Sequence, residues 1–158
     1  MREMNLEKLV GKTPADTRDA EGSILRSEQG AFEVAVPYTG AEVTAQVVSR
    51  AAAFAAGLSV TLKLVAVYVA PYPADLRCPL AMQEHLSARL SELARRTKLA
   101  SSVHLIVSRD RTEGLLRCLG PGSAVLLGSP KRWWRTREER LAMALRRQGH
   151  HVFLLQLD

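Results

Sequence analysis

The sequence contains few aromatic residues, only two cysteines and no long apolar run. Phe, Trp and Tyr together make up 5% of its 158 residues. Because a membrane-spanning helix needs roughly 18 or more apolar residues in succession, we expect no membrane span. The opening residues MREMNLEKLVGKT lack the apolar core of a signal peptide, so we expect a cytoplasmic protein. Cys78 and Cys118 lack metal-ligand spacing, which predicts reduced thiols and no metal site.

The composition is that of a soluble globular protein, with 47% hydrophobic and 24% charged residues. Residues 1–30 are polar, with scattered Gly and Pro and little sustained periodicity. They predict a flexible arm or an addition to a sheet edge rather than a domain. Residues 31–158 are expected to form a single domain.

The net charge is +6, and the basic excess is concentrated near the C-terminus. The basic residues of that stretch are Lys131, Arg132, Arg135, Arg137, Arg140, Arg146 and Arg147. A solvated helix face with a basic loop is the simplest interpretation. A patch that meets phosphates, nucleic acid or an anionic membrane is the alternative. No nucleic-acid-binding module is recognisable, so we expect no nucleic-acid partner.

Short apolar runs alternate with segments of helical periodicity from residue 32 onward. The predicted strands are 32–36, 60–69, 101–107, 124–127 and 152–155. The predicted helices are 41–56, 80–99, 112–119 and 136–147. This alternation implies right-handed crossovers and a mostly parallel five-stranded sheet with helices on both faces. The predicted fold is therefore a three-layer α/β/α sandwich of Rossmann-like type.

Ligands of open parallel sheets bind at the carboxyl ends of the strands. Residues 128–135 follow the predicted strand 124–127 and are expected to form a loop at that edge. Any binding site is therefore expected to include this loop.

Three local patterns resemble the universal stress protein family. They are VAVPYTGAE (34–42), LVAVYV (64–69) and SRDRTEGLLRCLGPGSAVLLGS (108–129). The resemblance covers residues 32–157. It implies the adenine nucleotide alpha hydrolase-like arrangement of this fold, with strand order 3-2-1-4-5.

Nucleotide-binding members of that family use an Asp after the first strand and a Gly-x-x-Gly loop, followed about nine residues later by Gly-Ser/Thr. Here Thr39 stands at the Asp position, Gly128 is kept, and Lys131 replaces the second glycine. Leu141 and Ala142 stand where Gly-Ser/Thr is expected. The resemblance therefore implies a degenerate nucleotide site.

Two hypotheses follow for that site. In the first, the chain is a regulatory, ligand-sensing domain without catalysis, because it shows neither paired carboxylates nor a Gly-x-Ser-x-Gly nucleophile. In the second, basic side chains replace the glycine amides and hold ATP or AMP noncanonically. The candidate nucleotide-binding residues are Thr39, Gly40, Val69, Gly128, Ser129, Lys131 and Arg132.

The string PKRWW (130–134) resembles one in the stress-protein-like C-terminal domains of some amino-acid permeases. That similarity implies docking on a transporter or a sensor protein such as a kinase. The simplest interpretation of Trp133 and Trp134 is that one packs on the helix and the other caps a dimer surface. Base stacking and membrane-interface anchoring are the alternatives.

The last predicted strand lies at a sheet edge if the strand order follows the family. An exposed apolar edge tends to pair with another strand. Val152, Leu154 and Gln156 alternate along it. We therefore predict a homodimer formed through this strand.

Overall fold

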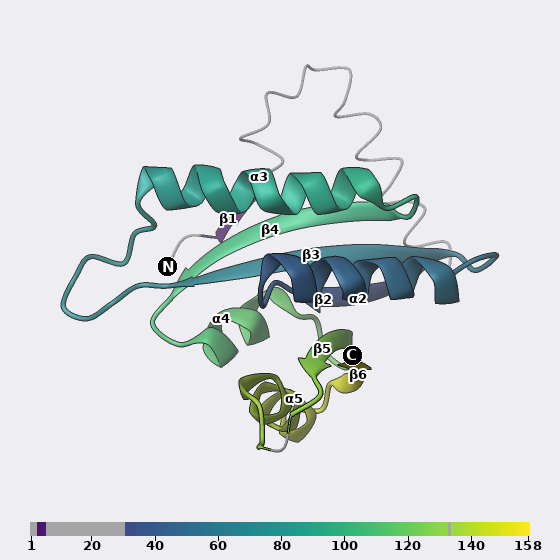
Figure 1. The fold of residues 1–158 in the computed structure, drawn as a ribbon. Helices are drawn as coiled ribbons and strands as arrows, with labels where there is room; N and C mark the ends of the chain where they lie inside the picture. Colours follow the sequence, from purple (N-terminus) through teal and green to yellow (C-terminus); the bar gives the residue numbers. More distant parts are fainter. Residues whose placement is uncertain (1–2, 6–30, 133) are drawn as a thin grey trace.

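The computed structural model describes residues 3–5, 31–132 and 134–158 (Figure 1). Their elements follow in the order β1 (Glu3–Asn5), β2 (Phe32–Pro37), α2 (Ala41–Phe54), β3 (Val60–Val69), α3 (Leu80–Arg96), β4 (Ala100–Ser108), α4 (Arg111–Cys118), β5 (Ala124–Pro130), α5 (Arg137–Arg147) and β6 (His151–Leu157). No helix within these ranges has both the length and the apolar character needed to cross a membrane.

One sheet carries all the described strands, in the order β1-β4-β3-β2-β5-β6. The last five are mutually parallel, so the predicted parallel sheet and its order 3-2-1-4-5 are confirmed. β1 pairs antiparallel with β4, with Met4 opposite Leu105. The rest of the predicted arm, residues 1–2 and 6–30, lies outside the described residues.

Helices cover both faces of the sheet. On one face, α2 packs on β2 and β5 and α3 packs on β3 and β4; α4 and α5 cover the other face (Figure 1). Alternation along β3 supplies both layers, because Leu62 and Leu64 enter one apolar core and Val65 enters the other. Each fully buried Leu or Val stabilises the fold by about 1.5–3 kcal/mol relative to an exposed one.

Lys63 is the one charge in the middle of β3, and a local bond compensates its burial. Its side chain points to the same face as Val65, and Nζ donates a hydrogen bond to the Cys118 carbonyl at 2.7 Å. Glu33 Oε1 lies 4.0 Å from the same nitrogen. The lysine therefore ties the central strand to the end of α4.

β5 is longer than predicted, because Gly128, Ser129 and Pro130 belong to the strand and not to a loop. Their composition is typical of a turn, but pairing with β6 continues as far as Pro130 opposite Leu157. Tertiary pairing thus overrides local preference here. The connection from β5 to α5 begins only at Lys131.

A capping box fixes the start of α5. Thr136 Oγ1 accepts a hydrogen bond from the Glu139 amide at 3.2 Å, and the Glu139 carboxylate accepts one from the Thr136 amide at 3.2 Å. This reciprocal arrangement satisfies two backbone donors that a helix N-terminus would otherwise leave unpaired. Gly149 ends the segment at φ +87°, a conformation that favours glycine.

Candidate functional site

The strands reach the carboxyl edge of the sheet at different heights. β2 ends at Pro37, opposite Val65, whereas β3 continues four residues further to Val69. At about 3.3 Å per residue, this extension is about 13 Å long. Val69 is 45% exposed at its tip. The predicted site residues are therefore distributed around the end of a short central strand.

Thr39 and Gly40 form the turn that leads from β2 into α2. The Thr39 amide donates to Thr44 Oγ1 at 3.1 Å, and Thr44 is buried in the first turns of the helix. Gly40 occupies the N-cap position with extended backbone, and no side chain caps α2. The turn is thus held from within the helix.

Gly128 has a packing role. A Cβ atom built on it would lie 2.6 Å from Val47 Cγ2, 2.9 Å from Leu157 Cδ1 and 3.0 Å from Val43 Cγ1. Such distances are far shorter than ordinary carbon–carbon contacts. The glycine is therefore required where α2 approaches β5.

Ser129 is buried, and its side chain is used within the fold. Its Oγ lies 2.9 Å from Thr136 Oγ1, the hydroxyl that also caps α5. The bond links the end of β5 to the start of α5 across the connection. Among the described residues, no histidine or carboxylate contacts this hydroxyl in a way that would activate it.

Lys131 and Arg132 lie just beyond β5 with exposed side chains. The Lys131 amide donates to the Leu157 carbonyl at 3.1 Å, so this backbone donor already serves the sheet. Trp134 is 78% exposed beside them, and Trp133 lies outside the described residues. The Lys131 amide is thus not available to an anion, whereas the exposed side chains of Lys131 and Arg132 are.

Val69, the last residue of β3, and Lys131, the first residue after β5, lie at the same register height on the two sides of β2. Ala35 of β2 pairs with Lys63 on one side and with Val125 on the other. Val69 and Lys131 are each six residues beyond those partners. The fold therefore brings the candidate residues at the ends of β3 and β5 to the same carboxyl edge of the sheet, as parallel strands require.

The residues predicted to form the dimer edge on β6 do not all face solvent. Val152 is buried and Leu154 is half-buried, and both pack in the layer of α4 and α5. Gln156 is exposed. Among the described strands β6 pairs with β5 on one side and with none on the other, so it is an edge strand of this sheet, as predicted.

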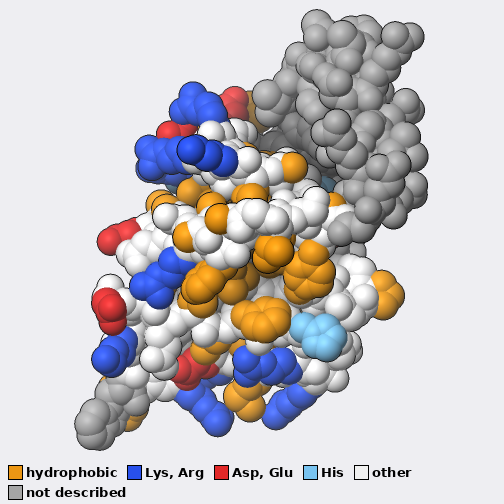
Figure 2. Space-filling model, turned by 90° about the vertical axis from the view of Figure 1, so that its right-hand side faces the viewer, with side chains coloured by type: hydrophobic (Ala, Val, Ile, Leu, Met, Phe, Trp, Pro, Cys, Tyr) orange, Lys and Arg blue, Asp and Glu red, His pale blue; other side chains and the backbone are white. Residues whose placement is uncertain are grey.

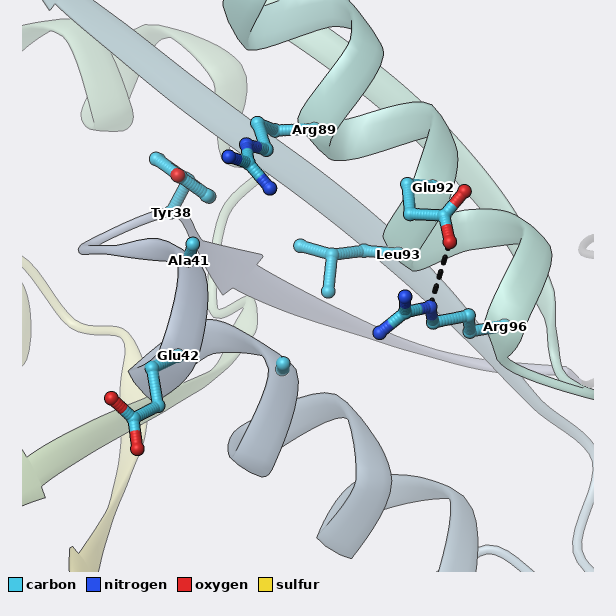
Figure 3. Close-up of a pocket in the computed structure, with 8 residues that line it drawn as sticks. Tyr38, Ala41, Glu42, Arg89, Glu92, Leu93 and Arg96 are labelled. Carbon is cyan, nitrogen blue, oxygen red and sulfur yellow. Dashed lines mark hydrogen bonds and ion pairs between the residues drawn. The ribbon is translucent and has the colours of Figure 1, made fainter.

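Sequence reasoning missed a pocket between α2 and α3, shown in Figure 3. Its volume is about 300 Å³, the lower end of the range for ligand pockets. Its lining residues are Tyr38, Ala41, Glu42, Ala45, Arg89, Glu92, Leu93 and Arg96. The floor is apolar and the rim is charged, a combination suited to an amphiphilic small molecule.

The charges around this pocket are not all neutralised. Glu92 accepts a hydrogen bond from Arg96 Nε at 2.8 Å and also pairs with Arg95. The hydrogen bond from Arg96, followed by the nearby guanidinium charges, lowers the pKa of the Glu92 carboxyl below its ordinary value. Within the described part of the chain, Arg89 makes no hydrogen bond or ion pair.

Figure 3 shows how these side chains lie. Arg89 extends from α3 toward Tyr38, and Leu93 points into the space between the two helices. The Glu42 carboxylate points away from both pocket arginines. An exposed guanidinium without a partner among the described residues thus borders this pocket, where it can pair with an anionic group.

The sequence held a partial signal for this pocket. Arg89, Leu93 and Arg96 follow the i, i+4, i+7 spacing of one helix face. Periodicity alone does not place that face against the start of α2, because this depends on how the two helices cross.

Hydrophobic side chains also gather at the amino edge of the sheet, on the face shown in Figure 2. Phe32 begins β2, Phe54 ends α2 and Leu58 lies in the turn before β3; they are 59%, 75% and 66% exposed. Because this patch lies at the opposite ends of the strands, it is separate from the carboxyl-edge residues.

Comparison with solved structures identifies the class of fold. A universal stress protein from Archaeoglobus fulgidus superposes with a TM-score of 0.55 at 15% identity, covering 78% of this chain and 92% of that one. A universal stress protein in complex with cAMP superposes with a TM-score of 0.56 at 19% identity, covering 81% and 98%. The sequence matches no protein-family model and no curated protein. The fold is therefore that of the universal stress proteins, as the resemblance predicted.

Proposed function

We propose that the chain is a regulatory domain of universal-stress type that senses a small organic anion and carries out no catalysis. The observation that carries this proposal is the unpaired Arg89 guanidinium over the Leu93 floor of the α2–α3 pocket. Arg96 adds a second cation at the rim. The ligand class is a molecule with a carboxylate or phosphate group and a compact apolar or aromatic body.

The non-catalytic part of the proposal is supported by the use of Gly128 and Ser129. The space beside Gly128 is filled by the side chains of Val47 and Leu157, and the Ser129 hydroxyl forms a hydrogen bond with that of Thr136. Neither residue is disposed as a phosphate cradle or as an activated nucleophile. Sensing, rather than group transfer, is the role that such a domain supports best.

A second candidate is a noncanonical ATP or AMP site at Lys131 and Arg132. It is favoured by the exposure of both side chains, which enter no ion pair within the described ranges. One solved structure of similar fold carries cAMP, which supports including that nucleotide among the probes.

Thermal melting with ATP, AMP and cAMP, each with and without magnesium, distinguishes the two sites. Binding to the folded state at ten times Kd raises the melting temperature by about 3–6 °C for a domain of this size. We expect any shift to be lost in Arg89→Ala and kept in Lys131→Ala. A shift that is kept in Arg89→Ala and lost in Lys131→Ala would instead place the ligand at the end of β5. No shift with these nucleotides, small carboxylates or sugar phosphates overturns ligand sensing.

We further propose that the domain forms a C2 homodimer through β6 and that its exposed basic segment docks on a transporter or sensor protein. The open edge of β6 supports the first part. Trp134, 78% exposed beside Lys131 and Arg132, supports the second, because exposed Trp and basic side chains are enriched at interfaces. Sedimentation tests the dimer, and loss of partner binding in Trp134→Ala tests the docking surface.

A further inference from the structure

β6 presents a defined row of backbone groups to its open side. The His151 amide donates to the Ser123 carbonyl at 2.9 Å, and the Leu157 carbonyl accepts from the Lys131 amide at 3.1 Å. Both residues therefore direct these groups toward β5. Because strand groups alternate with a period of two, residues 153 and 155 do the same. The backbone N–H and C=O groups of Val152, Leu154 and Gln156 consequently face the open edge.

Two arginines occupy that row. Arg146 Nη2 donates to the Val152 carbonyl at 2.8 Å, and Arg50 Nη1 donates to the Gln156 carbonyl at 3.0 Å. Arg146 belongs to α5 and Arg50 to α2, so they reach the edge from opposite faces of the sheet. Neither forms an ion pair with a described residue. Of the three outward carbonyls, only that of Leu154 is left without an arginine.

The same row is self-complementary. In a two-fold antiparallel pair centred on Leu154, that residue lies opposite its own copy, and Val152 lies opposite Gln156 of the second copy. Residues opposite each other in such hydrogen-bonded positions exchange both their N–H and C=O groups. The carbonyls that the arginines hold are therefore those of the two flanking pairs. The arginines therefore compete with a second copy for these carbonyls.

We propose that Arg50 and Arg146 form a latch that holds the β6 edge closed against a second copy of the chain. Charged groups placed at a sheet edge are a known means of preventing unwanted pairing. Here the cations also satisfy the acceptors that a partner strand would use. This proposal rests on the proposed dimer through β6. It adds that these two side chains set the affinity of that dimer.

Sedimentation velocity of the whole chain over a wide concentration range tests the latch. Arg50→Ala and Arg146→Ala each free one outward carbonyl, and the double variant frees both. We expect the double variant to dimerise about tenfold or more tightly than the wild type, since four arginine–carbonyl bonds per dimer no longer need to break. Arg147→Ala is the matched control, because this exposed arginine of the same helical turn holds no described carbonyl. Far-UV circular dichroism checks that each variant is folded.

A further variant separates the latch from the dimer itself. Gln156→Pro removes one outward N–H group while leaving bonds to β5 intact, as proline is tolerated where a strand faces solvent. Added to the double variant, it should weaken the dimer. If the wild type and double variant dimerise equally, the latch is wrong and the dimer stands. If both stay monomeric, or if Gln156→Pro leaves the dimer unchanged, pairing through β6 itself is wrong.

Discussion

At the scale of single residues, the missing side chain of Gly128 decides how closely α2 packs on β5. The methyl groups of Val43 and Val47 fill the space where its Cβ would lie. This is a close-approach glycine rather than a turn glycine, since its backbone lies within a strand.

Gly128→Ala is therefore expected to lower the free energy of unfolding by about 1–3 kcal/mol, the usual cost of overpacking a core. Urea denaturation measures the change. Gly120→Ala is the control, because the nearest atom to its added Cβ is Ser123 Oγ at an ordinary 3.8 Å. Equal effects at the two positions would contradict the packing role of Gly128.

Glu92 provides a second test at this scale. Its folded pKa is lowered mainly by the hydrogen bond from Arg96. Its stabilising contribution is thus present above the unfolded pKa and is lost as pH falls through the folded pKa. We expect Arg96→Ala to raise the Glu92 pKa more than Arg95→Ala does, as followed by carboxyl NMR titration. A larger rise in Arg95→Ala would reverse this assignment.

At the scale of elements, connections are held by side chains that reach back to backbone carbonyls. Arg109, just after β4, donates to the carbonyls of Pro71 at 2.8 Å and Ala74 at 2.6 Å. Its guanidinium also lies 5.3 Å from the centre of the Tyr72 ring. One side chain thus fixes the first half of the β3–α3 connection, at the edge where Val69 ends.

Arg109→Ala should release this connection without unfolding the sheet. The amides of Tyr72 and of residues 74–78 are expected to exchange faster with deuterium, while those of β3 and β4 keep their protection. Hydrogen-exchange mass spectrometry measures both. Arg77→Ala, within the same segment, is the comparison, and equally fast exchange in both variants would show that Arg109 holds nothing in place.

The elements themselves were largely predictable, because apolar periodicity and length identify them. Residues 60–69 form β3 as predicted, and the predicted helix 136–147 differs from α5 by one residue. The predicted end of β5 was wrong. Gly128-Ser129-Pro130 has the composition of a turn, and only pairing with β6 keeps these residues in the strand. The pocket at Arg89 could not be found, because it depends on the crossing of α2 and α3.

At the scale of the whole molecule, two apolar layers share one sheet. Leu90 of α3 is buried in one layer and Leu145 of α5 in the other. β3 contributes side chains to both, so the layers are mechanically joined. The layering follows from the alternation of strands and helices, whereas the strand order came from the family resemblance.

Leu90→Ala and Leu145→Ala are each expected to cost about 2–5 kcal/mol of stability, as other buried leucines do. Because the sheet is shared, each variant should still unfold in one transition that different probes report together. Circular dichroism and hydrogen exchange in the opposite layer provide the two probes. Separate transitions would mean that the layers unfold independently.

The two borders of the sheet are unequal, and this limits what the molecule can build. β1 lies along β4 at Glu3–Asn5, whereas no described strand pairs with the outer side of β6. A plate with two open borders can add copies indefinitely and grow into a fibre. At one border the described edge strand β1 has only three residues, and short edge strands are one means by which proteins discourage edge pairing. If two copies pair through β6, as proposed above, we expect little further pairing at the β1 border, so that strand-mediated assembly ends at a pair.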